Sequence, residues 1–131
     1  MKKIIPLQFA YRLIMNGSLL IVASRGENKR DNIMTAAWST PLESNPPRLA
    51  LVIDPAHRTW ENLNIARVCT LNIVGRSTLR LARYAGTISG RARDKLAESG
   101  ALAVMGSVLD VPIFPECLAN IECRVLSQAA E

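Results

Sequence analysis

The sequence predicts a mainly β domain with short helices, most simply a small antiparallel β-barrel that carries helical insertions. The first three apolar segments follow one another without helical crossovers, which favours antiparallel pairing over a doubly wound parallel sheet. Two later segments alternate apolar and polar side chains, as half-buried strands do. The chain has 131 residues. This length suits one domain, residues 1–131, with a single hydrophobic core.

Three predicted strands occupy the first half of the chain and cover residues 19–23, 32–40 and 48–53. The first is a continuous apolar run, typical of a strand buried on both faces. Residues 25–31 are polar and contain a glycine, so they predict a hairpin connection to the second strand. Pro41 and the pair Pro46-Pro47 predict a loop before the third strand, because proline lacks an N–H donor and excludes a helix.

Helices and strands follow one another in the second half of the chain. Asp54-Pro55 predicts a helix start, since aspartate is a good N-cap and proline suits the first helical position. That helix would present Ala56, Trp60, Leu63 and Ala66 on one face. Gly86 and Gly100 are predicted to end two further helices. The remaining predicted elements are a strand over 68–74, helices over 77–84 and 91–98, a rigid loop over 112–115 and a strand near 121–125.

The two alternating strands have defined faces. In the strand over residues 68–74, Cys69, Leu71 and Ile73 point to one side. Near the end of the chain Ile121, Cys123 and Val125 share a face in the same way. Both strands are therefore expected to bury one row of side chains.

Composition excludes several classes of protein. Hydrophobic residues make up 49% of the chain, which is too much for intrinsic disorder. The longest apolar stretch, residues 4–23, is interrupted by polar residues and falls short of the about 18 apolar residues of a membrane span. Three cysteines without paired spacing and a single histidine favour neither a disulfide framework nor a metal site. They suit the reducing cytoplasm, where we expect the protein; Cys117 and Cys123 are then expected to be reduced, although their spacing permits pairing.

The chain is basic, with 16 lysines and arginines against 11 acidic residues and a net charge of +5. This charge admits nucleic acid, an anionic surface or a phosphorylated ligand as a partner. Only 5% of the residues are aromatic, which disfavours nucleic-acid binding by base stacking. Arg76, Arg80 and Arg83 share one predicted helix face. A solvated basic face is the favoured interpretation of these arginines, and an anion site is the alternative.

The second predicted strand has an unusual composition. Small side chains stand in a row at Thr35, Ala36 and Ala37 and are followed by the bulky Trp38. Small residues let a flat ligand lie close to the backbone, whose N–H and C=O groups can bind its polar edge. The alternative is that the small residues fit a crowded barrel interior. No phosphate-binding loop, dinucleotide fingerprint or Ser/His/Asp arrangement accompanies this strand.

The predicted helix start after residue 53 is a second candidate ligand site. A helix N-terminus presents free N–H groups and a positive dipole end, and Arg58 and Thr59 add donors suited to a phosphate. Asp54 adds negative charge and Pro55 lacks an N–H, so side chains would contribute more than the backbone. His57 on its own is more typical of a solvent-facing residue in a first helical turn.

Taken together, these segments resemble the flavin reductase-like family, most closely its flavoredoxin branch. The matching segments run in order through nearly the whole chain, and their order makes the resemblance specific. They are Asn32-Ile33-Met34-Thr35-Ala36-Ala37-Trp38, the loop to Pro46-Pro47, Asp54-Pro55-Ala56-His57-Arg58-Thr59, Leu71-Asn72-Ile73, Ser89-Gly90-Arg91-Ala92-Arg93-Asp94-Lys95, Glu116-Cys117 and Ile121-Glu122-Cys123-Arg124-Val125.

The resemblance implies an FMN-binding split β-barrel, usually a homodimer with the flavin near the subunit interface. By similarity, the ring would lie against Asn32 and the segment from Thr35 to Ser39, with Trp38 beside it. Arg58 and Thr59 would hold the phosphate, next to His57, and Lys95 would reach the flavin. Members of the family continue past the last predicted strand. The present chain is therefore expected to lack the C-terminal strands, and either a partner chain covers the exposed edge or the pocket is incomplete.

The implied function is that of an FMN-dependent oxidoreductase that takes hydride from NADH or NADPH. Flavin supplies that chemistry, which suits a sequence without an evident nucleophile or general base. One alternative is a flavoredoxin-like electron carrier that receives electrons from a redox partner protein. A second is a non-catalytic barrel for binding or assembly, and a nucleic-acid binder is the weakest alternative.

Overall fold

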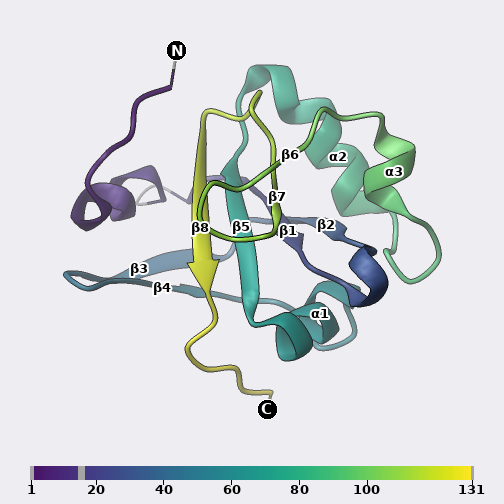
Figure 1. Ribbon diagram of the computed structural model, residues 1–131, viewed down its shortest axis with the longest axis horizontal. Helices are drawn as coiled ribbons and strands as arrows, with labels where there is room; N and C mark the ends of the chain where they lie inside the picture. The colour runs from purple at the N-terminus through teal and green to yellow at the C-terminus, as the bar shows by residue number, and fades with distance from the viewer. Residues whose placement is uncertain (1, 15–16, 131) are drawn as a thin grey trace.

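The computed structural model describes residues 2–14 and 17–130 and confirms the predicted fold class (Figure 1). The strands are β1 (Leu20–Ser24), β2 (Asn32–Ala36), β3 (Ser39–Ser44), β4 (Pro47–Leu51), β5 (Val68–Ile73), β6 (Val104–Met105), β7 (Pro112–Ile113) and β8 (Ala119–Arg124). The helices are α1 (Arg58–Ala66), α2 (Leu79–Thr87) and α3 (Lys95–Ser99), with short 3-10 helices η1 (Leu7–Leu13), η2 (Glu27–Lys29) and η3 (Arg76–Thr78).

A four-stranded antiparallel sheet, in the order β2-β1-β5-β8, forms the centre of the molecule. Two separate ribbons, β3-β4 and β6-β7, flank it, so the described strands form an open, split arrangement. β1 is buried along its whole length, as its apolar run predicts, because β2 and β5 pair with its two edges. Its residue Leu20 lies opposite Ala36 of β2 and Ile73 of β5.

The two faces of this sheet carry separate hydrophobic clusters, because alternate residues of a strand point to opposite sides. We call the side packed by α2 and α3 the helix face. Its cluster contains Ile21, Ala23, Ile33, Ala82, Ala85, Leu109, Val111, Phe114 and Cys117. We call the other side the groove face. Its cluster contains Ile14, Leu20, Val22, Ala36, Ile53, Leu63, Cys69, Leu71 and Ile73.

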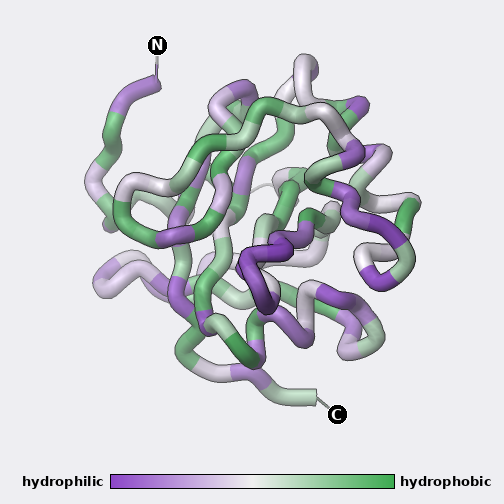
Figure 2. The backbone as a smooth tube through the Cα atoms, turned by 45° about the vertical axis from the view of Figure 1, so that its right-hand side comes forward, coloured by the Kyte–Doolittle hydropathy of each residue, from purple (hydrophilic) through white to green (hydrophobic). Residues whose placement is uncertain are grey.

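The groove face borders an open groove with a volume of about 780 Å³. Its walls come from η1, the β3-β4 ribbon, α1, β5 and β8, together with residues 125–129. In Figure 2 the hydrophobic stretches follow the inner strands, and the strongest hydrophilic stretches lie in connecting loops. Ile121, Cys123 and Val125 pack beside the groove-face cluster, which confirms the shared face predicted for them.

The segment between β2 and β4 differs from the prediction. The single strand expected over residues 32–40 breaks at Ala37 and Trp38. The loop expected from Pro41 to Pro46-Pro47 is only a turn at residues 45–46, since Pro41 and Pro47 lie in strands. A two-stranded ribbon tolerates them because each strand leaves one edge unpaired. Pro47 is the first residue of β4, and Pro41 precedes a shift of register.

The predicted start of α1 at Asp54 is wrong, because the Asp54 side chain caps a turn instead of the helix. Its Oδ1 accepts the Ala56 N–H at 2.8 Å, and its carbonyl accepts the His57 N–H at 3.0 Å. These bonds close a turn over residues 54–57 in which Pro55 suits the second position. The helix therefore begins at Arg58, with His57 as its N-cap.

The other helix limits also shift. α2 continues through Gly86 to Thr87, because this glycine serves close packing: a Cβ there would lie 3.1 Å from the Thr35 Cβ. α3 begins only at Lys95, where the Asp94 carboxylate accepts the Ala97 N–H at 3.1 Å. Its predicted end is confirmed, since Gly100 adopts a left-handed φ of 66°. The loop predicted over 112–115 contains β7, which pairs with β6.

The longest helices, α1 and α2, have nine residues each. Within residues 2–14 and 17–130, no helix has the length and apolar character needed to cross a bilayer.

Candidate functional site

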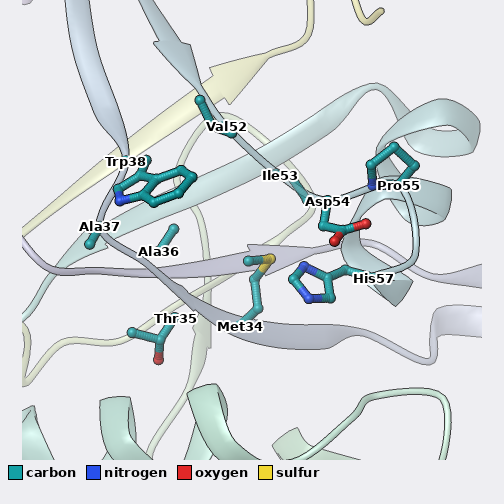
Figure 3. Close-up of a pocket in the computed structure, with 10 residues that line it drawn as sticks. All are labelled: Met34, Thr35, Ala36, Ala37, Trp38, Val52, Ile53, Asp54, Pro55 and His57. Atoms are coloured by element: carbon teal, nitrogen blue, oxygen red, sulfur yellow. The ribbon is translucent and has the colours of Figure 1, made fainter. Parts of the chain in front are cut away.

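A pocket of about 450 Å³ lies where β2 ends and the turn before α1 begins (Figure 3). Its walls come from two segments that the sequence separates. One is the end of β2 with the residues that follow it, and the other leads from β4 into α1. The lining residues are Met34, Thr35, Ala36, Ala37, Trp38, Val52, Ile53, Asp54, Pro55 and His57.

The β2 side of the pocket is built by small residues and one indole. Thr35 points away toward the helices, where its Oγ1 donates to the Ala82 carbonyl. Ala36 and Ala37 leave the backbone close to the pocket, as the sequence indicates. Trp38 is held through its carbonyl, which accepts the Val52 N–H at 3.0 Å. Its side chain is 72% exposed, so the indole is a wall of the site and is not part of the core.

The opposite side of the pocket leads into the start of α1. The N-cap His57 makes no side-chain capping bond, so no such bond occupies the first N–H groups of this nine-residue helix. Such N–H groups and the helix dipole attract anions. The His57 ring lies beside Met34 in the pocket. This end of the pocket is therefore suited to a negatively charged group.

Two arginines meet at the same place. Arg58 Nη1 lies 3.2 Å from Glu61 Oε2, and Arg91 Nη1 lies 3.0 Å from the same oxygen. Arg91 Nε also donates to the Ala56 carbonyl at 3.0 Å, which ties the loop before α3 to the turn before α1. One carboxylate stands between two guanidinium groups, so the cluster keeps an excess of positive charge.

Asn32 and Thr59 form a buried link beneath the turn. Asn32 Nδ2 donates to Thr59 Oγ1 at 3.0 Å, and the two residues are 5% and 0% exposed. A Cβ on Gly90 would overlap the Asn32 side chain, so glycine is required there for the loop to approach. Both side chains hold β2 against α1 and lie outside the lining of the pocket.

Ser39 and Lys95 have different surroundings. Ser39 begins β3 next to Trp38, and its Oγ is buried with no hydrogen-bond partner in the part of the chain that the structure describes. Lys95 is 4% exposed among the helix-face residues, and its Nζ donates to the Ala85 carbonyl at 2.7 Å. Burial lowers the pKa of this lysine from 10.5 to about 8.

The structure thus gathers part of the predicted set in one pocket. Thr35, Ala36, Ala37, Trp38 and His57 line it. Arg58 lies next to it at the start of α1, whereas Asn32 and Thr59 support it from below and Lys95 packs on the helix face. Sequence reasoning did not assign Met34, Val52, Asp54 or Pro55 to the lining, or Arg91 to the end suited to an anion. The alternation of β2 could have indicated only Met34, because its side chain points to the same face of the strand as that of Ala36.

Comparisons with known proteins agree on one family. A family model described as a flavin reductase like domain matches residues 11–131. The Escherichia coli protein YddH, itself uncharacterised, is 37% identical over 96% of this chain and 69% of its own length. An FMN-binding domain of a flavin reductases-like enzyme from Shewanella baltica has a TM-score of 0.88 and 27% identity, covering 95% of this chain and 65% of that one. Flavoredoxin of Desulfovibrio vulgaris has a TM-score of 0.80 and 31% identity, covering 99% and 69%. The chain thus spans about two thirds of the length of these proteins.

Proposed function

The chain belongs to the flavin reductase-like family, and from that membership we propose that it binds FMN in the pocket between β2 and α1 and accepts hydride there from NADH or NADPH. The observation that carries the proposal is the meeting of two dissimilar walls at one pocket. One wall is small and flat, and the other leads through His57 to the start of α1, where Arg58 and Arg91 lie on Glu61. A phosphorylated flat molecule needs both.

The anion-binding end of the pocket supports a phosphate at the start of α1. The uncapped N–H groups of the helix and the guanidinium groups of Arg58 and Arg91 are the donor set that phosphate oxygens prefer. In the described structure both arginines share Glu61, which keeps them in place. A phosphate dianion would compete with that single carboxylate for the same donors.

The other end supports an aromatic ring system. A volume of about 450 Å³ falls within the range of about 300–1,000 Å³ that small-molecule pockets occupy. Ala36 and Ala37 let a ring approach the backbone, and Trp38 supplies an exposed aromatic wall. The buried Ser39 hydroxyl, which has no hydrogen-bond partner among the described residues, adjoins this segment. The residues present therefore fit FMN.

The bound flavin would supply the hydride chemistry, and the chain would bind and orient it. Arg58 and Arg91 fix the position of the phosphate end, while Trp38 covers the ring and excludes water from one side. We retain Lys95 as an indirect contributor: its charge, buried on the helix face, favours negative charge on a group bound across β2.

A flavoredoxin-like electron carrier is the second candidate function, and the flavoredoxin of Desulfovibrio vulgaris supports it through 31% identity. A carrier would receive electrons from a redox partner protein that approaches the exposed Trp38 side of the pocket. Oxidation of NADH or NADPH by the FMN-loaded chain separates the two functions. Turnover with either nucleotide supports the reductase. A chain that holds stoichiometric FMN yet oxidises neither nucleotide contradicts the reductase.

We also propose that the chain acts as a homodimer with the flavin close to the subunit interface. Trp38 and Val52, which line the pocket, are 72% and 60% exposed and offer an apolar surface for association beside it. Sedimentation velocity of the FMN-loaded chain tests this assembly, and a purely monomeric species at high concentration would contradict it.

Equilibrium titration with FMN tests the proposed site. Arg58→Glu should weaken the affinity at least about tenfold, since it replaces a charged hydrogen bond worth about 1.5–3 kcal/mol with repulsion. The variant loses the ion pair with Glu61, but a glutamate in the first helical turn interacts favourably with the helix dipole, so folding is retained. Arg80→Glu, an identical charge change at an exposed position of α2, is the matched control and should bind FMN like the parent chain. Equal affinity in the parent and Arg58→Glu chains, or an equal loss in both variants, would overturn the phosphate assignment.

A further inference from the structure

Two of the three cysteines lie opposite each other on neighbouring strands of the central sheet. Cys69 of β5 is the direct register partner of Cys123 of β8, and both are free thiols. Val125 N donates to the Arg67 carbonyl at 2.9 Å, which makes residues 67 and 125 a hydrogen-bonded pair. The antiparallel pattern alternates along the ladder, so residues 69 and 123 form a hydrogen-bonded pair as well. Cα atoms in such pairs lie about 5.5 Å apart, within the about 4.4–6.8 Å that a disulfide spans.

The two thiols of this pair differ in their exposure to solvent. Both side chains belong to the groove face and line the groove of about 780 Å³. Cys123 is partly exposed on the edge strand, whereas Cys69 is buried behind it at 5% exposure. Cys117 is close to Cys123 in the sequence but packs on the helix face instead. The structure therefore separates Cys117 from the pair.

The two thiols also differ in acidity. The closeness of Cys123, together with burial, raises the pKa of the Cys69 thiol, and the closeness of Cys69 lowers the pKa of the Cys123 thiol. The thiolate is the nucleophile in disulfide exchange, and exposure decides which thiolate a substrate reaches. Cys123 has both properties, and Cys69 lies close enough to act second.

We propose that Cys69 and Cys123 form a thiol–disulfide exchange site, with Cys123 as the attacking thiol, Cys69 as the resolving thiol, and a small-molecule disulfide as the oxidising substrate. The Cys123 thiolate attacks one sulfur of the substrate, the substrate S–S bond breaks, and one substrate thiolate leaves and takes up a proton. Cys69 then loses its proton and attacks the Cys123 sulfur of the mixed disulfide, which releases the second substrate thiol. The chain loses two protons and two electrons to form the Cys69–Cys123 disulfide, and the substrate gains them as two thiols.

This site is separate from the pocket between β2 and α1, so it does not rest on flavin binding. None of the ten residues that line that pocket is a cysteine. The described residues contain no group of three or more His, Cys, Asp or Glu side chains placed to hold a metal ion. A pair of thiols without further ligands is suited to exchange chemistry more than to metal binding.

Oxidised glutathione is the probe for the test. The native chain is incubated with an excess of it, quenched by acid and alkylation, and digested with trypsin and a glutamate-specific protease. Cleavage after Glu116 and Glu122 places Cys117 and Cys123 on different peptides, which trypsin alone would leave together. We expect a peptide linked through Cys69 and Cys123, and a fall from three free thiols to one per chain. Cys69 and Cys123 that stay reduced, or a native linkage that uses Cys117, would overturn the proposal.

Single variants test the order of the two thiols. Cys69→Ser should accumulate a stable mixed disulfide with glutathione at Cys123, because the resolving thiol is missing. Cys123→Ser should leave Cys69 unmodified, because it is buried. Cys117→Ala is the matched control: it removes a buried thiol that lacks a register partner, and it should form the Cys69–Cys123 linkage at the parent rate. Glutathione on Cys69 in the Cys123→Ser chain, or no adduct at Cys123 in the Cys69→Ser chain, would contradict the assigned roles.

Discussion

The helix face and the groove face of the central sheet are made by the same strands and yet differ in how completely they are covered. On the helix face, Ile21 and Ile33 are fully buried, and Phe114 is 1% exposed. On the groove face, β8 contributes Ile121 and Cys123, which remain partly exposed at the wall of the groove. Alternation along a strand thus lets one set of residues supply stability while the neighbouring set stays accessible to ligands and reagents.

The largest effect expected from this comparison concerns two isoleucines on opposite faces. Ile33→Ala should lower the free energy of unfolding by about 2–5 kcal/mol, because it removes buried methyl groups and leaves a cavity. Ile121→Ala should lower it by only about 1–2 kcal/mol, since part of that side chain already contacts water. Chemical denaturation of both variants measures the difference. Equal losses would show that the groove face is covered in solution.

A second prediction concerns Lys95, the charged residue within the helix face. Burial lowers its pKa to about 8, so the unfolded chain binds more protons than the folded chain between pH 8 and 10.5. The free energy of unfolding should therefore rise with pH in this window, by at most about 1.4 kcal/mol per pH unit. Lys95→Met should lack this contribution.

The measurement is the difference between parent and Lys95→Met chains in urea denaturation across this pH range. Subtracting the free energy of unfolding of the variant from that of the parent chain at each pH cancels the titration of the other lysines and the tyrosines. A difference that stays constant with pH would contradict burial of the cationic form.

A third, smaller effect is expected at Glu122, which alternates with Ile121 and Cys123 on β8. Burial acts to raise the pKa of Glu122, but the N–H groups of Leu109, Val108 and Ser107 outweigh it and lower that pKa. Glu122→Gln should cost about 1–3 kcal/mol at pH 7, because a carboxamide has one accepting oxygen where the carboxylate has two.

The pH dependence of this cost has a defined sign. The stabilisation by Glu122 is complete above the unfolded pKa near 4.5 and is lost as pH falls through the lower folded pKa. The parent and Glu122→Gln chains should therefore converge in stability in acid. Glu116→Gln, at an exposed position nearby, is the control and should change stability little at any pH. A gap between parent and Glu122→Gln that persists in acid would show that the carboxylate charge does not carry the effect.

The parts of the fold that were predicted correctly depend on local patterns. The apolar run of β1 and the alternation in β5 and β8 record burial residue by residue, so they locate strands and faces without knowledge of the rest of the chain. Most of β4 lies within the strand predicted over residues 48–53, but the pairing of β3 with β4 escaped prediction because Pro41 and Pro47 argue locally against strands. Only the unpaired edges of a two-stranded ribbon make them acceptable.

The candidate site divides in the same way. The small residues at Ala36 and Ala37 and the arginine at the start of α1 were visible in the sequence. Arg91 reaches Glu61 across 30 residues, through a loop that approaches only because Gly90 has no side chain. The pairing of Cys69 with Cys123 depends on the register of two strands that are distant in the sequence. Contacts of this kind depend on the tertiary fold, and no local pattern encodes them.

The most direct test of the central claim is a titration of the isotope-labelled chain with FMN, followed by the backbone amide resonances. We expect the largest shifts at residues 35–39 and 54–59, which form the two walls of the pocket, with stoichiometric saturation and smaller changes along β8. No shifts at saturating FMN, or shifts confined to the groove between the β3-β4 ribbon and β8, would contradict the account.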